Sequence, residues 1–398
     1  MAERRAHKIC VMTGTRAEYG LLFWLMRELE ADAAVELQLV VSAMHLAPEF
    51  GHSIDLIRKD GFRIDAVVPC LSGGDDFQAL GTSIGTAELG FVSAFSKLKP
   101  DMLVILGDRF ETFAAAAAAT ALRIPIVHLH GGEASEGSMD DVFRHAITKM
   151  SHLHLVAAPA YRRRVIQMGE QPGHVHVVGA LGLENFKRLK LPDIGQLSGD
   201  LGFDLSGRYV LVTYHPATLE DRLPVLVVDE MIAALETLKD VKILATKANA
   251  DPGGRVINAR LEAWAGASPS RVKLVDNLGQ VRYLAALCGA AAVVGNSSSG
   301  LIEAPAVDVP TVNIGSRQNG RLMADSIIQA ADDRGSIVSA LHRALDPKFR
   351  DGLRQISPPY GRPVEIARSI VSIVKEADLS KLLKKTFYDL EERGRHVD

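Results

Sequence analysis

Short apolar segments rich in β-branched residues alternate with helical stretches along almost the whole chain. In the first half the segments are KICVMT (8–13), ELQLVVSA (36–43), DMLVILGD (101–108), IPIVHLH (124–130), HLHLVAA (152–158) and HVHVVGA (174–180). Helical stretches such as YGLLFWLMRELE and MDDVFRHAITKMS lie between them. Fully apolar strands separated by helices are typical of parallel sheets covered on both faces. The pattern therefore predicts an α/β fold.

This alternation breaks once, near the middle of the chain. Residues 187–208 are rich in Gly, Ser and Asp and contain a Pro, so we expect a linker there. The strand segments then return as YVLVTYH (209–215), VKILATK (241–247), RVKLVDN (271–277), AAVVGNS (291–297) and PTVNIGS (310–316). Single cores stop growing at about 250–300 residues, and the chain has 398. We predict two doubly wound, Rossmann-type domains facing a central cleft.

The overall composition excludes several classes of protein. The formal net charge is -3, which does not favour a nucleic-acid or membrane surface. The three cysteines, Cys10, Cys70 and Cys288, are far apart and form no CxxC pair, which favours a reducing compartment. The apolar run near the N-terminus is too short for a signal peptide or a membrane span. We expect a cytoplasmic protein.

Two turns in the first half carry residues suited to anions. In doubly wound folds, ligands bind beyond the carboxyl ends of the strands. In TGTRAEYG (13–20), Gly14 allows a tight turn, and Arg16 stands at a helix N-terminus that attracts phosphate. In GDRFE (107–111), Asp108 ends a strand beside Arg109 and is a candidate acid or base. The alternatives are an ordinary turn and a helix cap.

The segment HLHGGEASEGSMDDVFRHAITKMSHLH (128–154) concentrates titratable side chains. His128 and His130 are two apart, so a strand would direct both to one face. Asp140 and Arg144 are one helical turn apart and can form an ion pair. A metal site using the two histidines and Asp140 needs further ligands on later strands, where only His215 is a candidate. We therefore favour an acid/base loop that works without metal.

The second half provides a second anion site. In GNSSSGLIE (295–303), hydroxyl side chains and Gly300 begin a helix, and Glu303 lies one turn inside it, placed to bind a ribose diol. Arg317 follows a later strand, and His215 follows an earlier one. Two anion sites in opposing domains indicate a diphosphate, with a sugar on the N-terminal side and a nucleoside on the C-terminal side.

These motifs together resemble the hydrolysing UDP-N-acetylglucosamine 2-epimerases. The similarity runs in order from about residue 8 to 375, through TGTRAEYG, MHLAPEFG, LGDRFE, the segment 128–154, GNSSSGLIEA and NIGSRQNGR. It implies a GT-B-like fold whose last helix crosses back to the N-terminal domain. The domains would be 1–187 with the C-terminal helix 363–398, and 188–362. Family members use neither metal nor nicotinamide, act in sialic-acid-type synthesis, and usually form dimers or tetramers.

The resemblance also implies a mechanism. UDP leaves C1 while a base removes the C2 proton, giving a 2-acetamidoglycal. Water then adds, and a proton returns to the other face of C2. By resemblance Asp108 and Asp140 are catalytic, and Arg144 orients Asp140. The implied binding residues are Arg16, Arg109 and His215 for the diphosphate, Ser297, Ser298, Glu303 and Arg317 for the nucleotide, and His45 and His128 for the sugar.

One position departs from the sialic-acid-pathway pattern. Members of that group usually carry HxEGGE, whereas this chain has HLHGGE, with His130 at the carboxylate position. The variant is more similar to the enzymes that act on UDP-N,N'-diacetylbacillosamine for legionaminic acid. His130 or Glu133 would then supply the missing proton transfer, unless His130 only shapes the pocket. UDP-N-acetylglucosamine stays open as substrate, and UDP is not distinguished from GDP.

Four other functions remain as alternatives. A non-hydrolysing epimerase would return UDP to the glycal. A metal-dependent hydrolase would use His128, His130 and Asp140. A GT-B glycosyltransferase would need an acceptor, and a nucleotide-sugar sensor would bind without turnover.

Overall fold

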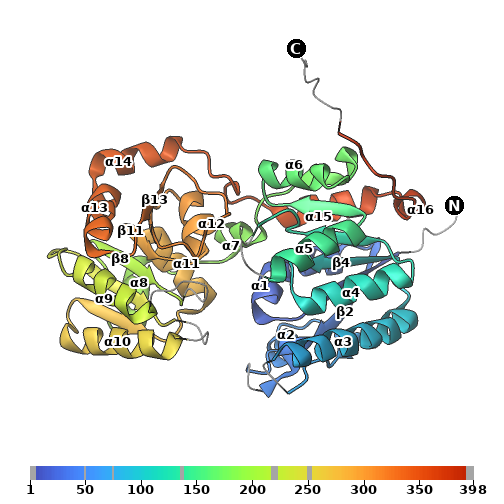
Figure 1. The fold of residues 1–398 in the computed structure, drawn as a ribbon, viewed down its shortest axis with the longest axis horizontal. Coiled ribbons are helices and arrows are strands. Elements are labelled where there is room, and N and C mark those ends of the chain that lie inside the picture. The colour runs from blue at the N-terminus through green and yellow to red at the C-terminus, as the bar shows by residue number, and fades with distance from the viewer. Residues whose placement is uncertain are drawn as a thin grey trace, which may run out of the picture. The chain divides into compact units, whose positions relative to one another are not determined.

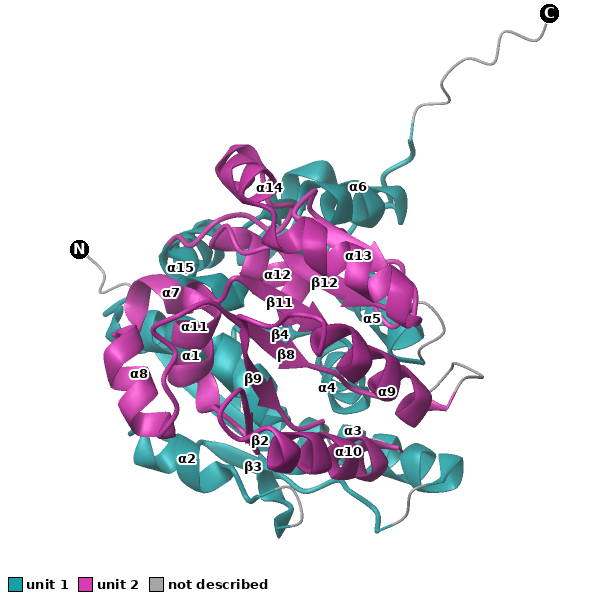
Figure 2. Cartoon of the chain, turned by 90° about the vertical axis from the view of Figure 1, so that its left-hand side faces the viewer, with its two compact units in different colours: residues 1–184, 365–398 teal, residues 185–364 magenta. Residues whose placement is uncertain are grey.

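The computed structural model describes residues 6–48, 51–73, 76–134, 139–216, 223–248 and 253–390. The chain divides into two compact units. Unit 1 contains residues 1–184 and 365–398, and unit 2 contains residues 185–364 (Figure 2). Each unit is built around one parallel sheet, and the prediction of two doubly wound α/β sheets is confirmed.

Unit 1 has seven parallel strands in the order β3-β2-β1-β4-β5-β6-β7. Strands β2 and β4 of this sheet are labelled in Figure 1. The strands are β1 (His7–Thr13), β2 (Val35–Ser42), β3 (Ala66–Val68), β4 (Met102–Leu106), β5 (Ile126–Leu129), β6 (Leu153–Val156) and β7 (Val175–Val177). The helices are α1 (Arg16–Ala31), α2 (Ile54–Lys59), α3 (Phe77–Leu98), α4 (Phe110–Ala121), α5 (Met139–Met150), α6 (Pro159–Gln167), α15 (Ile366–Glu376) and α16 (Leu379–Leu382).

Alternate side chains of each strand feed two separate cores. In β1, Val11 packs with α1, α2 and α15 on one face, while Cys10 and Met12 pack with α3, α4 and α5 on the other. This follows from the two-residue period of a strand. A sheet buried on both faces accounts for strands that read as continuous apolar runs.

Unit 2 has six parallel strands in the order β10-β9-β8-β11-β12-β13. The strands are β8 (Tyr209–Thr213), β9 (Lys242–Thr246), β10 (Val272–Val275), β11 (Ala292–Gly295), β12 (Thr311–Ile314) and β13 (Ile327–Ala330). The helices are α7 (Asn185–Arg188), α8 (Ile194–Leu201), α9 (Pro224–Leu235), α10 (Gly254–Ala267), α11 (Gly279–Gly289), α12 (Ser299–Ala306), α13 (Arg334–Leu345) and α14 (Pro347–Gly352). Helices α9, α10 and α13 cover one face, and α8, α11 and α12 the other.

Three details differ from the sequence-based expectations. The edge strands β3 and β13, of three and four residues, were not predicted. The expected linker 187–208 is wrong in part, since it contains α8, which a capping box between Asp193 and Gln196 starts. The expected helix over 363–398 ends as α15 at Glu376, and the chain continues through the short α16 into an extended segment.

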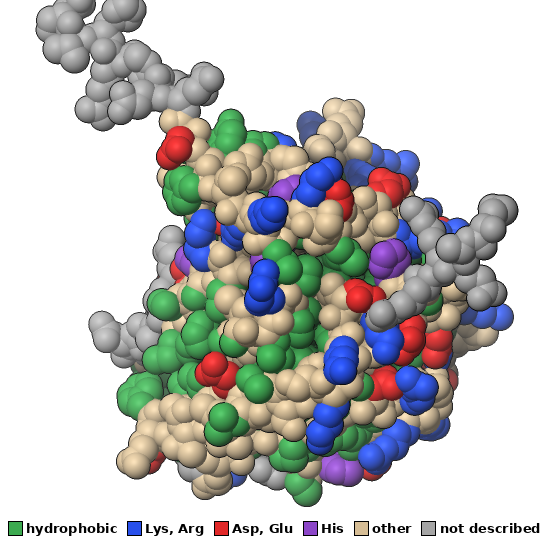
Figure 3. Space-filling view, turned by 90° about the vertical axis from the view of Figure 1, so that its right-hand side faces the viewer, with side chains coloured by type: hydrophobic (Ala, Val, Ile, Leu, Met, Phe, Trp, Pro, Cys, Tyr) green, Lys and Arg blue, Asp and Glu red, His purple; other side chains and the backbone are tan. Residues whose placement is uncertain are grey.

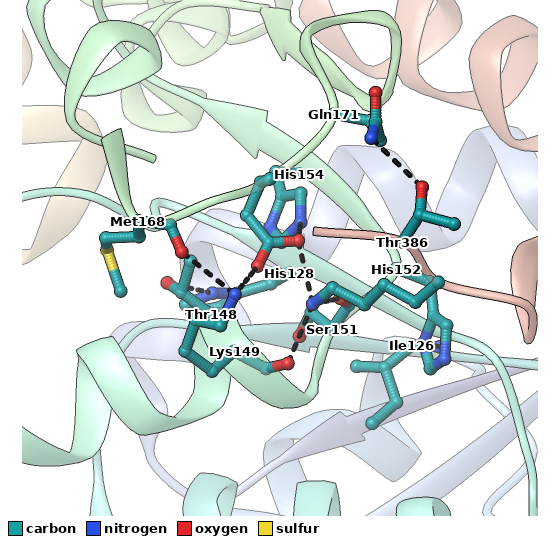
Figure 4. A network of polar contacts seen from close by, with 12 residues as sticks. Ile126, His128, Thr148, Lys149, Ser151, His152, His154, Met168, Gln171 and Thr386 are labelled. Carbon is teal, nitrogen blue, oxygen red and sulfur yellow. Dashed lines mark hydrogen bonds and ion pairs between the residues drawn. The ribbon is translucent and has the colours of Figure 1, made fainter. Parts of the chain in front are cut away.

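That extended segment is bonded to the body of unit 1. Lys385 Nζ donates to the carbonyl oxygens of Lys149 and Ser151, at 2.7 Å each, and lies 2.7 Å from Glu170 Oε2. The buried Glu170 also accepts from Lys149 Nζ at 2.6 Å and from His154 Nε2 at 2.9 Å (Figure 4). The C-terminal segment is therefore fixed to the end of α5 through one buried carboxylate.

The surface carries no strong bias of charge on the face that Figure 3 presents. Basic and acidic side chains are interspersed there, around an area of apolar ones (Figure 3). None of the helices in the described ranges combines the length and the apolar character needed to cross a bilayer.

Candidate active site

Both sheets have a switch point, where neighbouring strands lead to connections on opposite sides. In unit 1 it lies between β1 and β4, and in unit 2 between β8 and β11. Ligands of doubly wound folds bind beyond the carboxyl ends of the strands at such points. The sequence-predicted residues fall at these two places, and each is described within its own unit.

The turn after β1 is hydrogen-bonded to a side chain of α1, the helix that follows it. Thr15 caps α1, and Glu18 Oε2 accepts from the backbone amides of Gly14 at 2.8 Å and Thr15 at 3.0 Å. These two amides were expected to hold an anion, so the capping box takes part of that role away. Arg16, the first residue of α1, is exposed and keeps its predicted position at the turn.

Gly14 is required by a close approach rather than by its backbone angle. A Cβ there would lie 2.4 Å from Glu111 Oε1, so Glu111 occupies the space that a side chain would need. Glu111 is fully buried and accepts from Arg109 Nε at 2.7 Å. Burial alone lowers the pKa of Arg109, but the carboxylates of Glu111, Glu18 and Asp140 raise it overall. Glu111 of the GDRFE motif thus packs directly against Gly14 in the turn after β1.

Asp108 is bound to Arg144. The two side chains form a short ion pair between the end of β4 and α5, and Arg144 Nη1 lies 3.5 Å from Asp141 Oδ1. The ion pairs described for Arg144 are with Asp108 and Asp141, and its predicted pairing with Asp140 stays a prediction. Asp140 is exposed in the first turn of α5. The structure therefore brings Asp108 and α5 together, as a shared acid/base site requires.

His128 and His45 are buried and already bonded. His128 Nε2 lies 2.7 Å from the carbonyl oxygen of Gly107, and Nδ1 lies 3.2 Å from Thr148 Oγ1. His45 lies 3.0 Å from Thr13 Oγ1 and 2.7 Å from Ser53 Oγ.

Both rings are 0% exposed, and burial is the main cause that lowers the pKa of His45 to about 4 and of His128 to about 3. Both histidines therefore support the ends of their strands, and their contact with the sugar stays a prediction.

His130 differs from His128 because β5 ends at Leu129. His130 has a left-handed backbone (φ 63°), which is uncommon for a side chain other than glycine, so the expected strand alternation stops before it. Its Nδ1 lies 3.0 Å from Glu133 Oε1, and the backbone amide of Leu181 donates to Nε2 at 3.4 Å. An amide donor at Nε2 places the ring proton on Nδ1. The two residues that the sequence offered as alternatives are therefore one imidazole–carboxylate pair.

The alternative metal site would use His128 as a ligand. His128 lies buried with both ring nitrogens bonded. Across the described ranges, no group of three or more His, Cys, Asp or Glu side chains is arranged to hold a metal ion.

In unit 2 a buried asparagine joins the two strands at the switch point. Asn296 follows β11, and its side chain exchanges two 2.8 Å hydrogen bonds with the backbone of His215, which follows β8. Gly295 is needed just before it: its φ is 132°, and a Cβ would lie 2.0 Å from the carbonyl oxygen of Thr213. His215 is held beside the start of α12 as a result.

The remaining predicted residues lie near the start of α12. Ser297 and Ser298 are half-buried before its first residue, and Glu303 lies one turn inside. Burial is the largest influence on the carboxyl of Glu303 and raises its pKa to about 7. Arg317 is exposed and donates to the carbonyl oxygen of Asn296 at 3.1 Å. The helix N-terminus, the hydroxyl groups and the guanidinium that were expected to bind an anion thus lie in one part of unit 2, beside a carboxyl group.

Four supporting residues were not singled out from the sequence, namely Glu18, Glu111, Asn296 and Gln318. The T-x-x-E spacing of Thr15 and Glu18 is a capping-box signature and was available as a signal. The others depend on contacts between distant segments: Gln318, for example, donates to the carbonyl oxygen of Asn296 at 2.7 Å. No local pattern reports such contacts.

Comparison with known proteins agrees with this geometry. The family model described as "UDP-N-acetylglucosamine 2-epimerase" matches residues 27–375. The chain belongs to this family. It is 37% identical to the GDP/UDP-N,N'-diacetylbacillosamine 2-epimerase (hydrolyzing) of Campylobacter jejuni, over 96% of this chain and 99% of that protein. It is 35% identical to the polysialic acid biosynthesis protein P7 of Escherichia coli, over 97% and 98%.

Solved structures show the same fold. The UDP-GlcNAc 2-epimerase from Neisseria meningitidis bound to UDP-GlcNAc superposes with a TM-score of 0.78, over 93% of this chain and 100% of that one, at 16% identity. The predicted GT-B-like architecture and the predicted family are confirmed, and the chain is a 2-epimerase enzyme.

Proposed function

We propose that the chain is a hydrolysing epimerase that inverts C2 of UDP-N,N'-diacetylbacillosamine. The reaction cleaves the C1–O bond to the diphosphate and removes the C2 proton, giving UDP and a 2-acetamidoglycal. Water then adds its oxygen at C1, and a proton returns to the opposite face of C2. The products are UDP and a free manno-configured sugar, for use in nonulosonic-acid synthesis.

The His130–Glu133 pair is the observation that carries the choice of sugar. It stands where sialic-acid-pathway members carry a glutamate, and a relative named for the diacetylbacillosamine reaction is 37% identical over nearly the whole chain. In the pair, His130 Nδ1 lies 3.0 Å from Glu133 Oε1, and Nε2 accepts from the backbone amide of Leu181 at 3.4 Å. We assign the proton-transfer role of the missing carboxylate to this imidazole beside a carboxylate.

Asp108 and Asp140 exchange the C2 proton in this proposal. Arg144 holds Asp108 through the ion pair, and it also orients Asp140 as the resemblance implies. Asp140 lies exposed at the start of α5, where a substrate can reach it. Two carboxylates in different settings suit the acid and base roles that elimination and hydration require.

The nucleotide side of the site uses unit 2. Ser297, Ser298 and Arg317 hold the diphosphate end of the nucleotide together with His215. Glu303, with its pKa raised to about 7, can both accept and donate hydrogen bonds to a ribose diol. Arg16 and Arg109 bind the diphosphate from unit 1.

The decisive experiment is proton NMR in D₂O with chelator present. UDP-N,N'-diacetylbacillosamine and UDP-N-acetylglucosamine are supplied separately, followed by their GDP forms. We expect free UDP and a C2-deuterated manno sugar from the first substrate. An epimerised sugar still attached to UDP would indicate the non-hydrolysing reaction. Loss of turnover with chelator would favour a metal hydrolase, and binding without turnover a sensor.

His130→Glu tests the choice of sugar directly. The variant restores the HxEGGE pattern, and we expect kcat/KM to rise for UDP-N-acetylglucosamine and to fall for the diacetamido substrate. Parallel losses for both sugars would mean that His130 does not determine the sugar.

A further inference from the structure

Two carboxyl groups are buried together beneath the first turn of unit 1. Glu18 is 9% exposed and Glu111 is 0% exposed. Each has one oxygen that is bonded: Glu18 Oε2 to the amides of Gly14 and Thr15, and Glu111 Oε1 to Arg109 Nε. Glu18 Oε1 and Glu111 Oε2 are also buried, and neither has a hydrogen-bond partner among the described residues. Burying carboxyl groups in this way is costly and asks for a functional reason.

The geometry of Arg109 provides that reason. Glu111 holds the guanidinium by its Nε side, at 2.7 Å, and the side chain keeps 36% of its surface exposed. Among the described residues, the hydrogen bond of Arg109 Nη2 is to the weakly accepting Met44 Sδ, at 3.6 Å. The terminal nitrogens, which match phosphate oxygens in a forked geometry, are therefore directed away from the carboxylate that orients them.

We infer that Glu111 is a positioning residue that holds Arg109 in place for the substrate diphosphate. The inference rests on the proposed function, in which Arg109 binds that diphosphate. A guanidinium already fixed in its bound orientation loses less conformational entropy when the ligand arrives. The position of Glu111 also depends on Gly14, since any larger residue there would displace the Glu111 carboxylate.

Glu18 is compatible with the positioning of Arg109 by Glu111 when its own carboxyl group is neutral. Burial is the largest cause that raises its pKa to about 8, and the charge of Glu111 adds to it. The charged groups that act on the cluster are Glu111 and Arg109 from the start of α4 and Asp140 from α5. A second carboxylate would compete for Arg109, so UDP affinity should fall as pH rises through about 8.

The test measures UDP binding by calorimetry, which does not depend on turnover. Glu111→Gln keeps the shape but loses the charge, and we expect UDP to bind about tenfold more weakly. In an Arg109→Ala background the same substitution should have no further effect. Arg109→Lys lacks the Nε that Glu111 holds, and we expect it to lose as much UDP affinity as Glu111→Gln. It provides the test of the inference if Glu111→Gln does not fold. Glu30→Gln, in an exposed pair with Arg27, is the matched control.

Three results would overturn the inference. They are unchanged UDP affinity in Glu111→Gln, an equal loss in the Arg109→Ala background, and normal affinity in Arg109→Lys. In Glu18→Gln the decline of affinity around pH 8 should disappear, whereas a purely structural role would leave the pH profile in place. If wild-type protein binds UDP but shows no epimerase activity, the proposed function fails while the positioning of Arg109 still stands on its own data.

Discussion

Replacing Glu170 by Gln should destabilise unit 1 at neutral pH. This carboxylate is 2% exposed and accepts from His154, Lys149 and Lys385. Burial on its own would raise its pKa, but the three donors lower it to about 2. His154 is held neutral by burial, which lowers its own pKa, so the buried network is a neutral imidazole and two ammonium groups around one carboxylate. The glutamine removes the only negative charge in that network.

The size of the effect follows from the pKa. A fall from the usual 4.5 to about 2 corresponds to about 3 kcal/mol of stability at neutral pH. Because the folded pKa is depressed, this stability is present above pH 4.5 and is lost as pH falls toward 2. Wild type and Glu170→Gln should therefore differ by a constant amount between pH 5 and 7 and converge in acid.

The two tryptophans make the assay specific to each unit. Trp24 lies in α1 of unit 1 and Trp264 in α10 of unit 2. Urea unfolding of Trp264→Phe protein reports unit 1, and that of Trp24→Phe protein reports unit 2. Glu170→Gln should shift only the Trp24 transition. Asp55→Asn, which breaks an exposed ion pair in unit 1, is the control and should leave the transition in place.

Two outcomes would refute this reasoning. A shift in the Trp24 transition well below 1 kcal/mol at pH 7 would mean that the three donors do not stabilise the carboxylate. A difference that persists undiminished near pH 3 would mean that the substitution acts through packing rather than through charge.

Three further predictions concern the site. Asp108→Asn and Asp140→Asn should each lower kcat at least 100-fold with little change in KM, because proton transfer is a property of the transition state; near-normal kcat in either would remove it from the catalytic group. Arg16→Ala should weaken UDP inhibition about tenfold, measured as Ki, if the exposed guanidinium binds phosphate. Gly295→Ala should destabilise unit 2 by about 3 kcal/mol or abolish folding, seen in the Trp264 transition, because its Cβ would clash with the backbone.

Much of the fold was predictable because its signals are local. Strand segments buried on both faces read as continuous apolar runs, as in Ile9–Met12 of β1 and Tyr209–Val212 of β8. The edge strand β3 escaped prediction, whereas β7, also of three residues, was predicted from the alternation in HVHVVGA, which Ala66–Val68 lacks. Helix α8 was missed because Gly and Ser in its sequence are typical of loops, while its capping box is brief.

The site was predictable only in part, for a physical reason. Residue types at strand ends can be read from the sequence, and Asp108, Arg109 and His130 were found in this way. Which partner each one takes depends on tertiary packing. The helical spacing places Arg144 within reach of Asp140, but it does not predict the ion pair with Asp108 after β4. The sequence likewise does not report that His128 is buried with Nε2 2.7 Å from the carbonyl oxygen of Gly107.

The chain leaves unit 1 and returns to it at one place. Glu184, the last residue before unit 2, accepts at 2.7 Å from the backbone amide of Ala367 in the first turn of α15, so residues 185–364 form an insertion within a single domain. Helix α15 then covers the apolar face of α1. During synthesis on the ribosome, unit 1 is therefore begun before unit 2 but is completed after it. The part of the apolar face of α1 that packs on α15 stays uncovered until nearly the whole chain has been made, and a chaperone that binds exposed apolar helices would meet it there during synthesis.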